Sequence, residues 1–464
     1  MRRFFRKGEF PVSKNRSIPL PPYVETAIKQ LESHGFQAWC VGGCVRDSLL
    51  GNTPHDWDIA TSALPEETLA SFPGQRLLQT GISHGTITLL PAEGTSLEIT
   101  TFRTESGYSD NRHPDQVRFS TSLEEDLSRR DFTVNAMAYH PVHGIVDPFG
   151  GQRDLEQKTL RAVGDPCRRF AEDALRILRG LRFASQLCFT IESHTSSALV
   201  SARHLLQSLS PERVQGELTK LLCGPSVLPV LQRYASVLFS VLPELAPMEG
   251  CTQETPYHCY DVWEHTLHAI DHAAPEPALR WALLLHDAGK PEAKIFSPEG
   301  RAHFYGHPAK SGNIARQVLA RLRFPKKEQV WIGTLVDHHE APLPMTEKQL
   351  KDFLGRYRAP FTFQLLALIE ADMSAKAPGV FERRLPDIQL SRRRAETILA
   401  RGDCLQVKDL AVHGDDLLQL GIPAGPSIGA LLQFLLQAVQ DGTTPNQKDA
   451  LLQAALQWQK EQLP

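Results

Sequence analysis

Hydrophobic and polar positions follow two different periods along the chain, and the change falls near residue 160. Before it, short apolar or alternating runs are bounded by turn-forming residues, which is typical of β-strands. After residue 165, apolar residues recur every three to four positions, and this pattern predicts helices to the end. The expected fold class is therefore α+β, with a mixed-sheet head and all-helical domains after it. The expected strands of the head lie at 37–43, 56–60, 84–91, 96–103 and 143–151, with a helix over 24–35 and a mostly helical stretch over 124–140.

Changes in this pattern, together with short proline-rich breaks, divide the chain into segments without long linkers. The expected segments are an N-terminal extension (1–24), a head (25–160), a helical neck (161–250), a histidine-containing helical domain (251–380) and a helical tail (381–464).

Composition narrows the classes of protein that fit. The chain has 464 residues, of which 41% are hydrophobic and 22% charged, with a net charge of −3. This balance excludes a wholesale polyanion binder, so any contact with nucleic acid must come from local basic patches. No apolar run reaches the ~18 residues that span a bilayer, and no apolar region follows the basic start, so an exposed tail is expected rather than a signal peptide. The eight cysteines show no CxxC pairing, which favours reduced thiols in a cytoplasmic protein.

The stretch "CVGGCVRDSLLGNTPHDWDIA" at 40–60 is the first candidate for chemistry. Gly43 and Arg46 follow an apolar run, where bared backbone N–H groups and a guanidinium suit a phosphate. Asp56 and Asp58 are two positions apart on an expected strand, so their side chains share a face and repel unless a cation neutralises them. The alternative is a plain turn with solvated charges, but the combination favours a Mg²⁺ site. Glu98, on another expected strand, is a candidate third carboxylate or an ordinary edge residue.

Five motifs in order then produce a resemblance that covers about 180 residues. They are "VGGCVRD" with "DWDIAT", "RRDFTVNAMA" at 129–138, "DPFGGQRDL" at 147–155, "EDALRILRGLRF" at 172–183 and "RVQGELTKLL" from residue 213. Together they resemble the nucleotidyltransferases of the tRNA CCA-adding and bacterial poly(A) polymerase type, and the segment 409–432 is similar to the tail of Gram-positive-type relatives. The resemblance implies that Asp56 and Asp58 are catalytic and hold Mg²⁺, and that Gly43, Arg46 and Arg130 bind the triphosphate. It also implies contacts of Arg130, Asp131 and Asn135 with ribose and triphosphate.

The fourth motif contains a carboxylate and three arginines at a spacing of three. On one helix these side chains would share a face and could satisfy the hydrogen-bonding edge of a base. The resemblance implies that Asp173 and Arg176 read the base of CTP or ATP, while Arg179 and Arg182 hold phosphates or support the site. The alternative is a solvated salt-bridge ladder, which contributes little to stability.

Two further segments bear on the RNA substrate. The polar stretch 101–119 lies where full CCA-adding relatives have a flexible loop, which favours a complete CCA adder or an A-adding enzyme. The neck and the basic run "SRRRAETILAR" at 391–401 are expected to hold tRNA through its phosphates.

A second chemistry is expected after residue 260, where histidines and carboxylates lie in helical contexts. Imidazole and carboxylate together suit Mn, Fe, Ni or Zn. The pattern resembles the HD superfamily of metal phosphohydrolases, although such folds also survive as scaffolds. The candidate ligands are His265, His286, Asp287, His307, His338, His339 and Asp372.

These patterns favour an enzyme that adds CMP and AMP to the 3′ end of tRNA, from CTP and ATP, without a template. A poly(A) polymerase or A-adding enzyme is the close alternative. A metal phosphohydrolase with an RNA-binding head is the alternative from another class, and the intact aspartate pair speaks against it.

Overall fold

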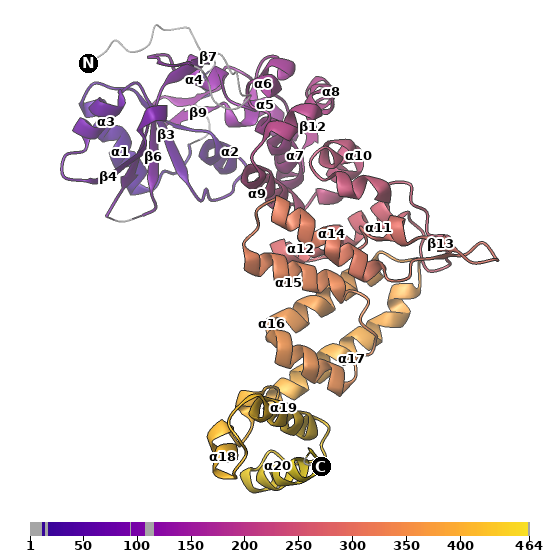
Figure 1. Ribbon diagram of the computed structural model, residues 1–464. Coiled ribbons are helices and arrows are strands. Elements are labelled where there is room, and N and C mark those ends of the chain that lie inside the picture. Colours follow the sequence, from indigo (N-terminus) through magenta and orange to yellow (C-terminus); the bar gives the residue numbers. More distant parts are fainter. Residues whose placement is uncertain (1–11, 14–16, 93, 107–115, 463–464) are drawn as a thin grey trace. The chain divides into compact units, whose positions relative to one another are not determined.

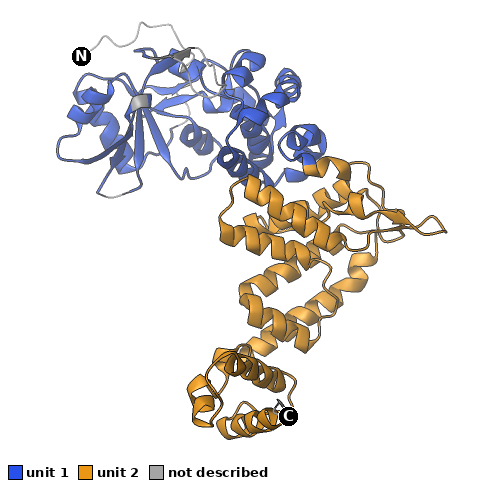
Figure 2. Cartoon of the chain, in the orientation of Figure 1, with its two compact units in different colours: residues 1–243 blue, residues 244–464 orange. Residues whose placement is uncertain are grey.

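The computed structural model describes residues 12–13, 17–92, 94–106 and 116–462. The chain divides into two compact units, Met1–Pro243 and Glu244–Pro464 (Figure 2). No helix among the described residues is both long and apolar enough to cross a membrane. All eight cysteines lie in the described part, and each is a free thiol.

An eight-stranded mixed sheet forms the centre of the first unit (Figure 1). The strand order is β1-β10-β9-β2-β3-β6-β5-β4, in which β3 and β6 run parallel and the other neighbours antiparallel. With the helical regions that follow, this confirms the expected α+β class. The strands are β1 (Val12–Ser13), β2 (Ala38–Val41), β3 (Trp57–Thr61), β4 (Arg76–Gly81), β5 (Thr86–Leu90), β6 (Leu97–Thr101), β9 (Ala138–His140) and β10 (Gly144–Val146).

Every residue of β2 is buried, because helices cover both faces of this sheet. Trp39 and Val41 pack with Leu123 and Leu127 of helix α4, and the alternation of strand side chains turns Cys40 to the opposite face. The helices beside the sheet are α1 (Pro22–Ser33), α2 (Gly43–Leu49), α3 (Pro65–Ser71) and α4 (Leu123–Ser128), with a 3₁₀ turn η1 (Ile82–His84).

The first residues of the described chain differ from the expected exposed tail. Val12 pairs with Val146 and Ser13 with Ile145, so that β1 is an edge strand of the sheet. Residues 1–11 and 14–16 lie outside the described residues.

The stretch 124–140 is not mostly helical, which corrects the sequence-based expectation. Helix α4 ends at Ser128, a single 3₁₀ turn η2 (Thr133–Asn135) follows, and β9 completes the segment. The apolar residues of β9 fit a strand because they lie between β2 and β10, where both ladders satisfy the backbone. Strand β4 was also not anticipated. The ends of the polar stretch 101–119 form a ribbon of β7 (Arg103–Ser106) and β8 (Gln116–Phe119), and residues 107–115 lie outside the described part.

Helices complete the first unit after β10. Asp165 caps α6 by accepting a hydrogen bond from the Cys167 N–H group. Helix α7 packs against α9, and the short strands β11 (Thr159–Leu160) and β12 (Thr190–Ile191) pair in parallel. The elements are α5 (Gly151–Glu156), α6 (Pro166–Glu172), α7 (Leu175–Leu187), α8 (Ser193–Ser201), η3 (Ala202–Ser208), α9 (Pro211–Leu222) and α10 (Val227–Phe239). The 3₁₀ turn η4 (Pro243–Met248) begins at the last residue of this unit and lies mostly in the second.

The second unit is almost wholly helical. A hairpin of β13 (Ile295–Phe296) and β14 (Ala302–His303) precedes α14. The other elements are α11 (Val262–His272), α12 (Pro277–Leu285), α13 (Lys290–Ala293), α14 (His307–Arg321), α15 (Lys326–Asp337), α16 (Glu347–Ser374), α17 (Val380–Arg401), η5 (Val407–Asp409), α18 (Gly414–Gln419), α19 (Pro426–Gln440) and α20 (Lys448–Gln462).

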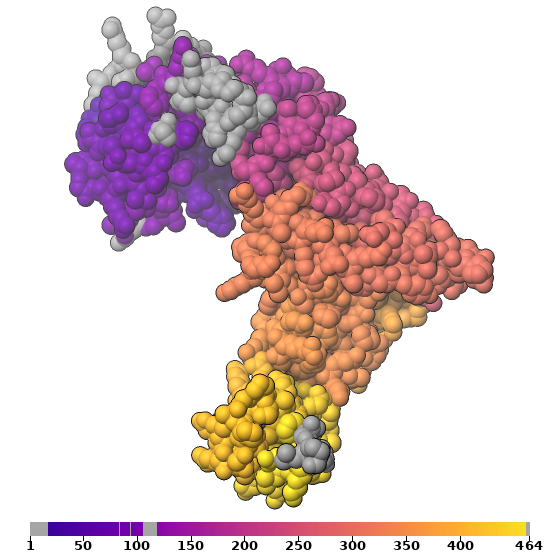
Figure 3. Space-filling model, viewed as in Figure 1, coloured from indigo at the N-terminus to yellow at the C-terminus, as the bar shows by residue number. Residues whose placement is uncertain are grey.

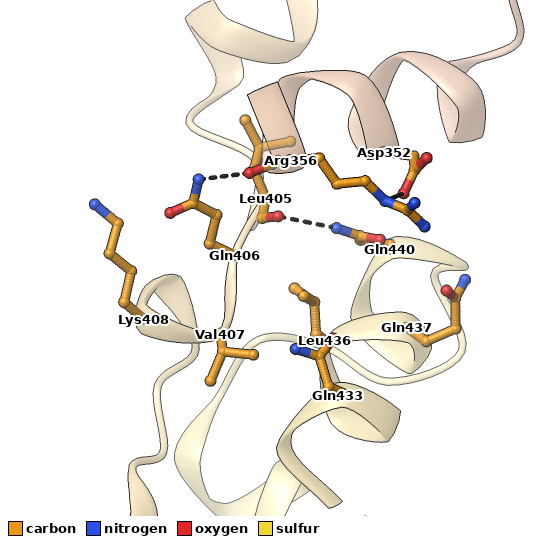
Figure 4. Close-up of a pocket in the computed structure, with 11 residues that line it drawn as sticks. Asp352, Arg356, Leu405, Gln406, Val407, Lys408, Gln433, Leu436, Gln437 and Gln440 are labelled. Atoms are coloured by element: carbon orange, nitrogen blue, oxygen red, sulfur yellow. Dashed lines mark hydrogen bonds and ion pairs between the residues drawn. The ribbon is translucent and has the colours of Figure 1, made fainter. Parts of the chain in front are cut away.

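The last three helices of this unit share an apolar core that runs from Cys404 to Ala455. A polar cavity of about 460 Å³ lies between this core and the start of α16 (Figure 4). There Gln406 Nε2 donates to the Gly355 carbonyl (2.7 Å) and Gln440 Nε2 to the Leu405 carbonyl (3.3 Å). Helix α17 packs along α16. The five segment boundaries expected from the sequence stay predictions.

Gly151 offers a test of the packing beneath the sheet. A Cβ at this position would meet the Thr133 carbonyl and would lie 2.9 Å from Met137 Cγ. We expect Gly151→Ala to destabilise the protein by about 1–3 kcal/mol, because the buried surroundings must shift. Gly216→Ala is the control, since nothing lies within 4 Å of its Cβ position inside α9 and alanine favours a helix. The melting temperatures of both variants check this expectation. A wild-type melting temperature for Gly151→Ala would contradict it.

Candidate functional site

A glycine turn separates β2 from α2 and brings the backbone to the carboxyl end of β2. Gly42 has φ 80° and ψ −134°, a conformation that side-chain-bearing residues rarely adopt. A Cβ there would stand 2.8 Å from Nη1 of Arg130. Glycine is therefore needed both for the turn and for the close approach of this guanidinium.

The predicted aspartate pair lies beside this turn. Asp58 is on β3, whereas Asp56 precedes the strand, which begins at Trp57. Asp58 is in register with Glu98 on the parallel strand β6. Burial raises the pKa of Asp58 to about 6 against the opposing effect of Arg130, and the neighbouring carboxylates of Glu98 and Asp56 contribute to this rise. Carboxylates crowded in this way fit a divalent cation, which would compensate both effects.

A single cavity of about 600 Å³ gathers the residues predicted for the head. It brings together residues from α2, β3, η2, α7 and α9 and from the turns between elements. Each predicted residue lines it: Gly43, Arg46, Asp56, Asp58, Arg130, Asp131, Asn135, Asp173, Arg176, Arg179 and Arg182.

A buried network holds part of this wall in place. Arg179 bonds to Oδ2 of Asp131 through Nε (2.7 Å) and Nη2 (2.6 Å), and Asn135 Nδ2 donates to Oδ1 of Asp131 (3.1 Å). Arg46 Nη1 in turn donates to Asn135 Oδ1 (2.7 Å). Burial alone would raise the pKa of Asp131, but Arg179 and the bond from Asn135 hold it at about 2.

The helix expected to carry Asp173 is interrupted at that residue. Helix α6 ends at Glu172 and α7 begins at Leu175, while Asp173 has extended backbone angles. Its Oδ1 accepts the N–H of Leu175 (3.0 Å), so Asp173 stands before α7 rather than on its arginine face. The carboxylate still lines the cavity and is held by Arg213 Nη2 of α9 at 3.3 Å.

The other two arginines of the motif have buried carboxylate partners as well. Arg176 donates to Glu172 Oε2 (2.9 Å) and to the carbonyl of Arg129 (2.9 Å). Arg182 donates to Glu217 Oε1 of α9 (3.1 Å). These pairs are not the solvated ladder that the sequence left open, because Arg176, Arg182 and Glu217 are buried.

Among the residues of this cavity that sequence reasoning did not assign to the site, Phe183 and Arg213 carry the clearest chemistry. The Phe183 ring has three guanidiniums around it, with the Cζ atoms of Arg182, Arg46 and Arg179 at 4.1, 5.1 and 5.3 Å from the ring centroid. Cations near an aromatic face are attracted by its quadrupole. The apolar period of α7 made Phe183 look like an ordinary core residue, whereas Arg213 opened a recognised motif.

A second cluster lies wholly in the second unit and surrounds Asp287. Two triads share this carboxylate, His265–His286–Asp287 and Asp287–His307–His339. Asp287 Oδ2 is 3.2 Å from His286 Nε2 and 3.7 Å from His265 Nε2, while Oδ1 is 3.3 Å from His307 Nε2 and 3.7 Å from His339 Nε2. Asp372 Oδ1 approaches His265 Nε2 at 2.8 Å.

The four imidazoles of this cluster are oriented in the same way. Each Nδ1 lies near a backbone carbonyl, at 3.1 Å in His265, 2.7 Å in His286, 2.9 Å in His307 and 2.7 Å in His339. A neutral ring that donates from Nδ1 keeps a lone pair on Nε2, which is the arrangement that metal-ligating histidines need. The Nε2 atoms of His307 and His339 are only 3.1 Å apart.

Buried polar atoms that lack well-directed hydrogen bonds mark the same centre. Among the described residues, His286 Nε2 and both carboxylate oxygens of Asp287 have only ion-pair contacts with one another, with neighbouring histidines and with Lys290. Burial alone would lower the pKa of His286, but the carboxylates of Asp287 and Asp372 raise it to about 10. Lys290 Nζ lies 2.8 Å from Asp287 Oδ2, and Lys376 Nζ lies 3.2 Å from Asp372 Oδ2. The cluster therefore fits metal cations, which would take the place of the imidazole protons and of the ammonium groups of Lys290 and Lys376.

His338 does not belong to this cluster, which corrects the predicted ligand set. Helix α15 ends at Asp337, and the ring of His338 packs against Phe353 and Tyr357 of α16 at 5.1 and 5.9 Å. Neighbouring residues at a helix end point in different directions, so only His339 of the pair reaches Asp287.

A third group of possible metal ligands is Glu32 with His140 and His143. In this group the ring of His140 carries its proton on the other nitrogen. Nδ1 of His140 accepts the N–H groups of Val142 (3.1 Å) and His143 (3.2 Å). Burial lowers the pKa of His140 to about 4, so the ring is neutral and its proton lies on Nε2, 3.1 Å from Glu32 Oε1. That nitrogen has no lone pair for a metal.

The basic run at 391–401 is largely engaged within the protein. Arg392 bonds to Glu370 (3.0 Å), Arg394 to the Met345 carbonyl (2.7 Å) and Arg401 to Glu347 (2.9 Å). Its role in holding RNA therefore stays a prediction.

We expect Phe183→Leu to raise the KM for nucleotide by about threefold to tenfold, because the guanidiniums lose a cation–π contact of roughly 0.5–2 kcal/mol. Phe183→Tyr keeps the aromatic face and is expected to restore the wild-type KM. Steady-state kinetics and thermal unfolding of both variants distinguish this role from core packing. Equal KM values for leucine and tyrosine variants of matched stability would contradict it.

Comparisons with known proteins agree with this geometry. Residues 38–161 match the family profile described as "Poly A polymerase head domain", residues 188–248 match an RNA and SrmB-binding site of polymerase A, and residues 310–455 match tRNA nucleotidyltransferase domain 2. The chain is 36% identical over 436 residues to the CCA-adding enzyme of Geobacillus thermodenitrificans, covering 93% of this chain and 96% of that one. It is 36% identical over 451 residues to the CCA-adding enzyme of Levilactobacillus brevis, covering 94% and 98%.

A solved structure supports the same relationship. The Bacillus stearothermophilus CCA-adding enzyme in complex with CTP is similar with a TM-score of 0.70 and 31% identity, covering 96% of this chain and 99% of that one. With matching motifs, fold and site, the chain belongs to the CCA-adding enzyme family of nucleotidyltransferases.

Proposed function

We propose that this protein adds CMP and AMP to the 3′ end of tRNA, using CTP and ATP without a template, as a cytoplasmic enzyme. The observation that carries the proposal is the single cavity in which the aspartate pair faces a wall of arginines. The similar Bacillus stearothermophilus enzyme was solved in complex with CTP, which supports a nucleotide as the ligand of this chain. The reaction joins the 3′ oxygen of the RNA to the α-phosphorus and releases pyrophosphate.

Nucleotidyltransferases of this family use divalent metal. In this chain Asp56 and Asp58 would hold Mg²⁺, which supplies positive charge at the attacking and leaving oxygens of a phosphoryl transfer. Arg46 and Arg130 are placed to bind the triphosphate, and Asn135 is fixed by Arg46 and Asp131 to face the same space.

We assign selection of the base to Asp173 and Arg176. The contacts that fix both side chains support this assignment. Asp173 is fixed by Arg213 and the Leu175 N–H group, and Arg176 by Glu172. A site with fixed donors and acceptors discriminates because a wrong base leaves buried groups unpaired. A poly(A) polymerase or an A-adding enzyme remains the alternative, since it would use the same parts.

Replacing the metal-binding carboxylate tests the proposal. We expect Asp58→Asn to reduce nucleotide incorporation by about a thousandfold or more, because the charge stabilisation of the transition state is lost. Binding of tRNA should remain within about twofold. Glu66→Gln, an exposed carboxylate on α3, is the matched control and should keep full activity.

The assay uses tRNAs that end in the discriminator base, in -C and in -CC, each with one labelled nucleotide. Addition of C, C and A in order supports the proposal, whereas addition of A alone to all three favours the alternative. Retained incorporation by Asp58→Asn would contradict the assigned metal site.

We propose a second function for the second unit, a metal-dependent phosphohydrolase of the HD type. The shared carboxylate of Asp287 between two histidine pairs favours it, and it favours two ions rather than one. His265, His286 and Asp372 would hold one ion and His307 and His339 the other, with Asp287 between them. Mn, Ni, Fe or Zn fits these ligands, and such an ion supplies a water molecule activated for attack on a phosphoester.

Metal content tests this second function without relying on activity. We expect His339→Gln to lose about half of the bound metal by elemental analysis, because one histidine pair is broken. The adjacent His338→Gln is the matched control and should keep the full amount, since that ring faces Phe353 and Tyr357. Nucleotide addition should persist in both variants. A wild-type protein without bound Mn, Ni, Fe or Zn, and without hydrolysis of a 2′,3′-cyclic nucleotide, would show that the HD fold is a scaffold here.

A further inference from the structure

A buried carboxylate lies behind the arginines of the first unit's cavity and belongs to none of the groups assigned so far. Asp126 is on α4 and is 1% exposed, so the surface seen in Figure 3 is formed by other side chains. Asp126 does not line the cavity, whereas Arg129 and Arg130 do. Burying a carboxylate costs free energy unless the charge is paired, so the contacts of this side chain indicate what it does.

The two oxygens of Asp126 accept from different arginines. Oδ1 accepts from Nε (3.0 Å) and Nη2 (2.7 Å) of Arg129, and Oδ2 accepts from Nη2 of Arg130 (3.3 Å). Burial alone would raise the pKa of Asp126, but both guanidiniums hold it below its usual value, so the carboxylate is charged. Because Arg129 already compensates this charge, the contact of Oδ2 with Arg130 adds direction to the second guanidinium.

Arg130 extends from this contact to the glycine turn. Its Nη1 lies 2.8 Å from the position that a Cβ of Gly42 would take, and Asp58 Oδ2 lies 3.9 Å from the same position. The Nε atom of Arg130 is buried without a hydrogen-bond partner among the described residues. One edge of the guanidinium is thus held by Asp126, and the other faces the turn beside which the metal-binding aspartates lie.

The other oxygen of Asp126 secures the segment that α7 contacts. Arg129 is held through its side chain by Oδ1, and its backbone carbonyl accepts a hydrogen bond from Nη2 of Arg176 (2.9 Å). Arg176 is one of the two residues assigned to the base. The carboxylate therefore divides its work, with Oδ1 on the side of the base and Oδ2 on the side of the triphosphate.

We propose that Asp126 is a positioning residue for nucleotide addition, which aims the guanidinium of Arg130 at the triphosphate of the incoming nucleotide. The inference rests on the proposed nucleotide addition and names a further residue of the same site. An arginine that is fixed before its ligand arrives loses less side-chain entropy on binding, and its planar donors suit phosphate oxygens. A guanidinium released from Asp126 would turn to the nearby Asp58, the carboxylate that is meant for the metal.

Asp126→Asn separates the two sides of this carboxylate. Asparagine keeps one acceptor, which the two donors of Arg129 would retain, and turns an amide donor toward Arg130. A carboxylate that acted only through its charge would repel the triphosphate, so its loss would tighten the binding of CTP. A carboxylate that aims Arg130 predicts the opposite sign, because the arginine loses its fixed direction.

Equilibrium titrations of the full-length protein in Mg²⁺ give the dissociation constants of CTP and of cytidine, which lacks the triphosphate. We expect Asp126→Asn to raise the dissociation constant of CTP about tenfold and to leave that of cytidine within about twofold, because only the contact with phosphate is weakened. Glu124→Gln removes an exposed carboxylate from the same helix and is the matched control, which should bind both ligands as the wild type does.

A double-mutant cycle tests whether Asp126 acts through Arg130. In the Arg130→Gln background, Asp126→Asn should weaken the binding of CTP by less than about twofold, because a residue that acts through another has no effect once the other is gone. A structural role in folding would instead weaken the binding of CTP equally in both backgrounds.

Three results would overturn the positioning role: tighter or unchanged binding of CTP by Asp126→Asn, an equal loss for CTP and cytidine, or the same loss in the Arg130→Gln background. If Asp126→Asn does not fold, Asp126→Glu keeps the charge but displaces it by one methylene, and the same comparison of CTP with cytidine decides. If the wild type binds CTP but adds nucleotide to no tRNA, the proposed function fails, and the dissociation constants still decide about Asp126. A wild type that does not bind CTP overturns both.

Discussion

The ion pair between the buried carboxylate of Asp131 and the partly exposed guanidinium of Arg179 is the interaction on which the wall of the first unit's cavity depends. Asp131 lies between α4 and η2, and Arg179 lies on α7 in the helical half of the unit. Through Asn135, the same pair orients Arg46 at the glycine turn. Loss of Arg179 would leave the buried carboxylate of Asp131 without its main cationic partner, which is destabilising. The arginines that line the cavity are thus held by carboxylates and by Asn135 of the protein itself.

Local signals in the sequence predicted the parts of the fold that depend on local chemistry. Gly42 has a positive φ, which requires glycine, and Asp58 lies on a strand in register with Glu98. Spacing and residue type were therefore enough to predict the strand end at which the aspartates lie. Tertiary contacts decided the cases that failed. The apolar run of β9 suits a helix or a strand, and pairing with β2 settles it. The sequence did not reveal the break in the helix at Asp173, because Asp173 and the arginines after it keep a spacing of three. The break is seen only in the structure, where the Leu175 N–H group donates to Asp173 Oδ1.

Imidazole tautomers explain why similar groups of histidine and carboxylate have different roles. Around Asp287, backbone carbonyls take the Nδ1 protons, so that Nε2 of each ring faces the shared carboxylate and is the nitrogen available to a metal. At His140, backbone N–H groups occupy Nδ1 and force the proton toward Glu32. No sequence pattern reports this difference, because it depends on which backbone group lies behind the ring. The same limitation explains why His338 and His339 could not be told apart before the direction of their rings was known.

Strand β1 has a consequence for how the chain behaves in solution. By pairing with β10, residues Val12–Ser13 cover backbone groups that would otherwise form an open edge of the sheet. Open edges are templates on which other chains add strands, and native proteins shield them. Val12 and Ser13 thus shield the sheet from self-association. A shortened protein that begins after residue 16 would expose β10 to intermolecular pairing, although each residue that lines the cavity of the first unit would still be present.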